Sequence, residues 1–110
     1  MEHDPKAWLE DMLRAGEDIL AFTKGLSLSD YRNNNLVKAG VERKFLVIGE
    51  SLVRIRDEAP LTADQISDIS KIIGFRNVLV HGYDVIDDAT VWSAIIEKLP
   101  SLLAQIRDLI

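Results

Sequence analysis

The sequence has no cysteine, two histidines and three prolines in 110 residues. The missing thiols exclude disulfide bonds, thiolate zinc sites and cysteine nucleophiles, and two histidines are too few for a histidine-rich metal centre. No run of residues approaches the ~18 consecutive apolar residues of a membrane-spanning helix. The first residues, Met1 to Asp4, lack the basic and apolar segments of a signal peptide. We therefore expect a cytoplasmic protein that neither spans a membrane nor holds a metal or cofactor.

Basic residues are also in the minority, with 13 Lys and Arg against 18 Asp and Glu and a net charge of −5. Such a chain repels phosphate as a whole, which excludes indiscriminate binding to nucleic acid or to an anionic membrane but leaves room for a local basic site. The segment 27–58 is the exception, because its basic residues outnumber its acidic ones. Any bound anion is expected where this segment meets the next helix. Arg43 and Lys44 are candidate RNA contacts there, although solvated surface charges explain them equally well.

Apolar residues make up 47 % of the chain, and they recur at helical spacing. Asp4 and Pro5 are typical of a helix start, and the first helix is predicted to end at Gly25. Ser29 is the candidate N-cap of a second, central helix over about 30–58. Small residues within it, Gly40 and Gly49, mark places where another helix can pack closely.

The third helix is predicted to begin at the capping box Thr62–Gln65 and to end at Gly82. The fourth is predicted to begin at Asp87 and Asp88 and to be kinked by Pro100. These elements predict one all-α domain over residues 1–110, a four-helix up-and-down bundle. So high an apolar content in so short a chain also predicts burial against another subunit.

The segment from Gly74 to Asp84 places four polar residues in an otherwise apolar run: Arg76, Asn77, His81 and Tyr83. Asn77 and His81 are four residues apart and share one helix face. Arg76 and His81 differ by about 140° around the axis, so they lie on adjacent faces.

A purely structural interpretation of this segment is also available. His81 would complement the helix dipole, Tyr83 would cap the helix end, and Arg76 would pair with Asp84 or Asp87. Alternatively, Glu42 or Glu50 of the second helix would pair with Arg76. Trp8 and Trp92 lie in apolar stripes and are expected to be core or interface residues.

The segment 76–83 resembles the R-x4-H-x-Y signature of the HEPN superfamily, and specifically of its HepT-like toxins. Segments 41–43 and 47–51 resemble that group's second helix, and segments 91–92 and 99–102 resemble its last helix. The resemblance implies a metal-independent endoribonuclease, the toxin of a toxin–antitoxin pair. It implies that His81 is the base and Arg76 the phosphate clamp, with Asn77 a supporting hydrogen-bond partner and Tyr83 a substrate contact.

The resemblance also implies partners. HepT-like toxins form homodimers that bring two copies of the motif to one cleft, and they are paired with a minimal nucleotidyltransferase (MNT) antitoxin. That antitoxin can add AMP to the motif tyrosine, which would be Tyr83 here. Two other functions stay open at this point: a catalytically inactive HEPN bundle that binds nucleotides or a partner protein, and a plain helical adaptor.

Overall fold

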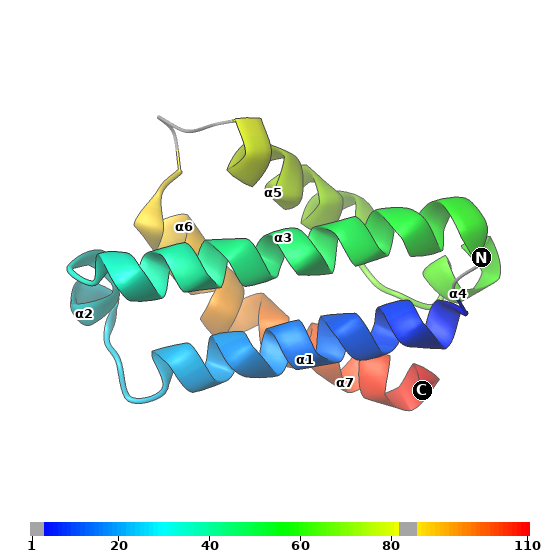
Figure 1. The fold of residues 1–110 in the computed structure, drawn as a ribbon, viewed down its shortest axis with the longest axis horizontal. Coiled ribbons are helices and arrows are strands. Elements are labelled where there is room, and N and C mark those ends of the chain that lie inside the picture. Colours follow the sequence, from blue (N-terminus) through cyan, green and yellow to red (C-terminus); the bar gives the residue numbers. More distant parts are fainter. Residues whose placement is uncertain (1–3, 82–85) are drawn as a thin grey trace.

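The computed structural model describes residues 4–81 and 86–110, and within these ranges every regular element is a helix. The elements are α1 (Pro5–Thr23), α2 (Leu28–Arg32), α3 (Asn35–Glu58), α4 (Pro60–Ala63), α5 (Ile69–His81), α6 (Asp88–Ser93), the π-helical turn η1 (Ala94–Lys98) and α7 (Leu99–Leu109). The long helices α1 and α3 lie side by side, α5 packs against α3, and α7 packs against α1 (Figure 1). The all-α prediction is confirmed, and α3 is central as expected.

Helix α1 begins and ends where the sequence predicts. The Asp4 carboxylate accepts a hydrogen bond from the backbone N–H of Lys6 at 2.9 Å, and Pro5 occupies the first turn, where its missing N–H costs nothing. Beyond the other end, Gly25 has φ 78°, a left-handed conformation that glycine adopts without a steric penalty.

The prediction of one continuous helix over 30–58 with Ser29 as its cap is wrong. Ser27 caps the short helix α2 through a capping box with Asp30, and this helix ends before α3 begins. Asn34 is extended there, and its side chain accepts a hydrogen bond from the N–H of Val37 at 3.1 Å. The break follows because an asparagine side chain satisfies a free N–H of a new helix better than it supports a helix interior.

The predicted start of the third helix is also wrong. Thr62 lies inside the short helix α4, and α5 begins only at Ile69, after Asp68 with φ 60°. Ser67 donates its N–H to the side-chain oxygen of Gln105 on α7 at 2.8 Å. A tertiary contact therefore occupies a backbone donor that a helix starting at Thr62 would have used. α5 ends at His81, and the expected stop residue Gly82 lies outside the described residues.

The last helical segment begins as predicted, with Asp87 as N-cap and Asp88 in the first turn. Before Pro100 the helix widens into the π-helical turn η1, and the Leu99 N–H bonds to the Ala94 carbonyl. The irregularity expected at Pro100 is therefore a local change of hydrogen-bond register, after which α7 continues with Pro100 in its first turn.

The core lies between the apolar faces of α1, α3 and the last helical segment. Its largest fully buried side chains include Tyr31, Met12, Ile19, Ile48, Leu52, Ile55, Leu99, Leu103 and Ile106. Trp8 is buried, and Trp92 is half-buried with its ring centroid 5.5 Å from that of Tyr31, which confirms both tryptophans as packing residues. None of the helices within residues 4–81 and 86–110 is long and apolar enough to cross a membrane.

Candidate active site

Arg76 reaches the candidate site because Gly49 lets α5 approach α3 closely. A Cβ atom added to Gly49 would lie 2.3 Å from the Cβ and 2.4 Å from the Cγ of Arg76. Real carbon atoms optimally stand about 3.5–4.0 Å apart, so no larger residue fits without moving a helix. The close approach predicted at Gly49 is confirmed. The stem of Arg76 lies on this glycine, and its side chain is only 23 % exposed.

The guanidinium group of Arg76 is held from two sides. Its Nη1 donates to the Oδ1 of Asn77 at 2.7 Å, and its Nη2 donates to the Oε1 of Glu50 in an ion pair. Its Nε is buried and has no hydrogen-bond partner among the described residues. Of the two carboxylates on α3 considered as partners, Glu50 pairs with Arg76. Asp87 instead caps α6, and Asp84 lies outside the described residues.

His81 is the last residue of α5, and it is exposed. Asn77 lies one turn before it on the same face, where side chains four residues apart have Cβ atoms about 5–6 Å apart. Because Asn77 also accepts from Arg76, the guanidinium is drawn towards the face that carries the imidazole. The structure thus links Glu50, Arg76 and Asn77 directly and places His81 one turn away. Tyr83 lies outside the described residues.

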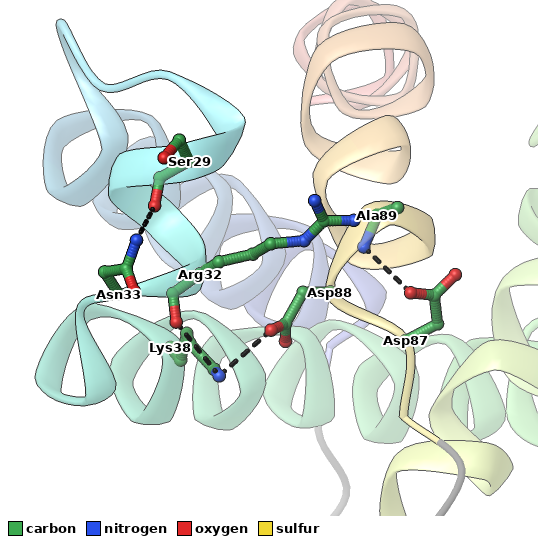
Figure 2. Close-up of polar contacts among 7 residues, drawn as sticks. All are labelled: Ser29, Arg32, Asn33, Lys38, Asp87, Asp88 and Ala89. Carbon is green, nitrogen blue, oxygen red and sulfur yellow. Dashed lines mark hydrogen bonds and ion pairs between the residues drawn. The ribbon is translucent and has the colours of Figure 1, made fainter.

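The next described helix after the motif is α6, and its first turn is held by an ion pair. Lys38 of α3 pairs with Asp88 at 3.0 Å and also donates to the backbone carbonyl of Arg32 on α2 at 3.5 Å (Figure 2). Asp87 accepts from the N–H of Ala89, as the same view shows. Lys38 therefore ties α2, α3 and α6 together behind the motif. Charge spacing along the sequence gave no sign of this contact, since it joins residues 50 positions apart.

Two further ionisable groups surround this anchor. Burial raises the pKa of the Glu42 carboxyl, the negative charge of Asp88 raises it further, and Lys38 lowers it. Burial also raises the pKa of the Tyr31 hydroxyl, with Glu42 and Asp88 adding to the shift. The Tyr31 hydroxyl has no hydrogen-bond partner in the described part of the chain. Neither side chain forms a hydrogen bond or ion pair with Arg76, Asn77 or His81.

Ion pairs neutralise part of the positive charge that was expected on α3. Lys44 pairs with Asp18 of α1 at 3.0 Å, which favours the structural interpretation of that residue. Arg43 and Arg54 are exposed and form no ion pair with any described residue. On α3, the basic side chains that remain without an ion pair to a described residue are therefore Arg43 and Arg54.

A cavity of about 640 Å³ lies apart from this cluster, between α5 and the last helical segment. Its apolar floor includes Phe45, Ile72, Phe75 and Leu99. Neither Arg76 nor His81 lines it, so the chemistry-bearing residues and this cavity occupy different faces of α5. Sequence reasoning missed this cavity, because each of its lining residues fits an ordinary core or surface position.

Metal ligands do not gather at the motif in the part of the chain that the structure describes. No group of three or more His, Cys, Asp or Glu residues there could hold a metal ion. What the cluster offers is a fixed cation, a carboxylate, an amide and an imidazole. Such a set can bind an anion, stabilise developing negative charge and transfer protons.

Comparison with known proteins agrees with this chemistry. Two proteins of Methanocaldococcus jannaschii, each named "Putative RNase", are similar to the chain: one is 27 % identical over 108 residues (96 % of each chain), and the other is 30 % identical over 109 residues (99 % of this chain and 89 % of the relative). The "Probable ribonuclease HepT" of Thermococcus cleftensis is 27 % identical over 109 residues, covering 99 % of this chain and 98 % of the relative. No solved structure matches significantly. The family model "Ribonuclease HepT-like" matches residues 12–109, and the chain therefore belongs to the HepT-like ribonuclease family.

Proposed function

We propose that this protein is a metal-independent endoribonuclease and the toxin of a HEPN/MNT toxin–antitoxin pair. The observation that carries the proposal is the Arg76 guanidinium, fixed over Gly49 and held by Asn77 one turn from an exposed His81, in a chain of the HepT-like family. Relatives that are named as ribonucleases match nearly the full length of the chain and support the same activity.

The chemistry follows from the residue types. Cleavage of RNA without a metal uses the ribose 2′-oxygen as nucleophile, so a protein group must accept its proton and a cation must stabilise the phosphorane. Imidazole exchanges protons near neutral pH, which suits His81 for proton transfer. A pre-positioned guanidinium stabilises the developing charge, which suits Arg76, and Asn77 holds that guanidinium in place. In this mechanism Tyr83 contacts the RNA.

The proposed active unit is a two-fold homodimer with its site at the seam between protomers. Symmetry would bring a second copy of the motif to the same phosphate, so that two guanidinium groups partly offset the negative field of the protein at that point. An apolar side chain exposed within the motif supports an interface there: Val78, beside Asn77 on α5, is 45 % exposed. A sedimentation mass of one 12.4 kDa chain at micromolar concentration would contradict the dimer.

The proposed partner is an MNT nucleotidyltransferase antitoxin that modifies Tyr83. The tyrosine oxygen would attack the α-phosphorus of ATP, forming AMP-tyrosine and releasing pyrophosphate. The added phosphate would lie close to Arg76 in sequence and would repel RNA from the cleft. Intact-mass analysis after incubation with antitoxin and ATP should show an AMP adduct that disappears in Tyr83→Phe.

The decisive experiment compares growth and RNA integrity on expression of wild type, Arg76→Ala and His81→Ala. We expect growth arrest and RNA cleavage only with wild type, with cleavage of the purified protein unaffected by a chelator. His81 is exposed, so His81→Ala should fold normally, and circular dichroism checks this. Equal growth and intact RNA with all three folded proteins would refute the nuclease and favour the inactive helical-bundle subunit.

A further inference from the structure

The proposed cleavage needs two proton transfers, and the described residues offer one imidazole for them. One group must accept the proton of the attacking 2′-hydroxyl, and another must protonate the departing 5′-oxygen. His81 is the only histidine within residues 4–81 and 86–110. The composite site would take the second group from the other protomer, but a candidate already lies in the same chain.

That candidate is Glu50. Its Oε1 accepts from Arg76, whereas its Oε2 accepts no hydrogen bond from any described residue. The side chain is 52 % exposed, so a substrate can approach it. Among the described residues, Arg76 of α5 pairs with Glu50, and Arg54 follows one turn further along α3. In its ion pair with Arg76 the carboxylate is a hydrogen-bond acceptor only.

The spacing also suits a scissile phosphate. Arg76 marks the level of Glu50 along α5, and His81 lies five residues further, about 7.5 Å along the helix axis. In an in-line displacement the attacking and departing oxygens stand on opposite sides of phosphorus, and each needs a proton-transfer group within about 2.6–3.2 Å. Two groups several ångströms apart, with a guanidinium bonded to one of them, match that requirement.

We propose that Glu50 is the general base of this ribonuclease and that His81 is its general acid, an assignment that rests on the proposed function. Glu50 removes the proton of the 2′-hydroxyl as the 2′-oxygen forms its bond to phosphorus. The bond from phosphorus to the 5′-oxygen breaks, and the protonated imidazole of His81 gives its proton to that oxygen. The products are a 2′,3′-cyclic phosphate and a 5′-hydroxyl, and solvent returns the proton from Glu50 to His81. This assignment makes His81 the acid, whereas the family resemblance implies that it is the base.

The pH dependence distinguishes this assignment from one in which Glu50 only holds Arg76. With Glu50 as base and His81 as acid, kcat/KM rises as the carboxylate ionises and falls as the imidazolium loses its proton, which gives a bell-shaped profile. With His81 as the base, kcat/KM rises as the imidazole becomes neutral and the acidic limb does not depend on Glu50. If Glu50 only positions Arg76, Glu50→Gln should raise KM and leave the shape of the pH profile unchanged.

The test measures kcat and KM against pH on a pool of short random-sequence RNA for wild type, Glu50→Gln, Glu50→Asp and the control Glu42→Gln. Glu42→Gln removes the same charge from the same helix, away from Arg76, and should leave kcat unchanged. We expect Glu50→Gln to lose about 10²–10⁴-fold in kcat together with the acidic limb, and Glu50→Asp to recover part of the rate with that limb present.

The two possible failures are distinguishable. If wild type cleaves RNA and Glu50→Gln keeps its kcat and its profile, the assignment of Glu50 is overturned while the ribonuclease stands. If Glu50→Gln changes only KM, Glu50 is a positioning residue, and the assignment is again overturned. If wild type cleaves nothing, both proposals fail together. Circular dichroism and urea unfolding of Glu50→Gln confirm that any loss arises in a folded protein.

Discussion

Replacing Gly49 by alanine tests the contact that brings α5 to α3. The new Cβ would lie 2.3 Å and 2.4 Å from the two inner carbons of the Arg76 side chain. These atoms are close to the backbone, so a rotamer change of Arg76 cannot clear them. These distances are roughly 1 Å shorter than an ordinary carbon–carbon contact of about 3.5 Å, so one helix must move by that amount. Such overpacking typically costs about 1–3 kcal/mol.

The chain contains a matched control in Gly74 of α5. A Cβ added there meets no atom within 4 Å, so Gly74→Ala should gain the helix propensity of alanine, about 1 kcal/mol, without a clash. Because Gly49→Ala gains the same propensity, the difference in unfolding free energy between the two variants isolates the packing term. We expect Gly74→Ala to be more stable than Gly49→Ala by about 1–3 kcal/mol.

Equilibrium unfolding in urea at one fixed protein concentration measures this difference, since stability depends on concentration if the protein is a dimer. The activity gives a second reading, because displacing α5 also displaces the guanidinium of Arg76 from Glu50. Equal midpoints for the two variants at equal slope would show that α5 does not rest on Gly49. The account of how Arg76 is positioned would then be wrong.

Three further predictions concern the fold around the site. Asn34→Ala should lose about 1 kcal/mol in urea unfolding, because it removes the cap of α3; no loss would argue against the cap. Tyr31→Phe should be neutral or stabilising, since it removes a buried hydroxyl without a partner, and a loss above 1 kcal/mol would reveal an unseen partner. Glu42 has a raised pKa in the folded state, so its ionisation opposes folding and stability falls as pH rises from its unfolded pKa to its folded one. Glu42→Gln should therefore exceed wild type in stability at neutral pH, with a gain that disappears in acid; a pH-independent difference would contradict the shift.

Local signals in the sequence were sufficient to predict a helix end where only one type of residue nearby can cap the helix. Asp4 with Pro5, and Asp87 with Asp88, marked helix starts that the structure confirms. Helical phasing also placed Asn77 and His81 on one face of α5, because the rotation per residue is fixed; their catalytic roles stay a prediction. The sequence offered Asp84, Asp87, Glu42 and Glu50 as partners of Arg76. Phasing alone could not choose between the two on α3, since Glu42 and Glu50 lie on similar faces of that helix.

The errors occurred where several residues compete for the same role. Ser27, Ser29 and Asn34 are all good caps, and the choice among them depends on how α2 packs against α6. The late start of α5 depends on Gln105, which lies 38 residues from its partner Ser67 and is invisible to local patterns. The cavity between α5 and the last helical segment reflects how far two helices are separated, and periodicity carries no information about that distance.

The burial of the Arg76 Nε has a stereochemical consequence. Of the five N–H groups of the guanidinium, one is buried and two bond to Asn77 and Glu50, so one remains on each terminal nitrogen. A cation that presents a single fixed edge treats the two non-bridging oxygens of a phosphodiester as inequivalent. Replacing one of them by sulfur should therefore slow cleavage unequally for the two phosphorothioate diastereomers, so that the chirality at phosphorus reports the orientation of this one side chain.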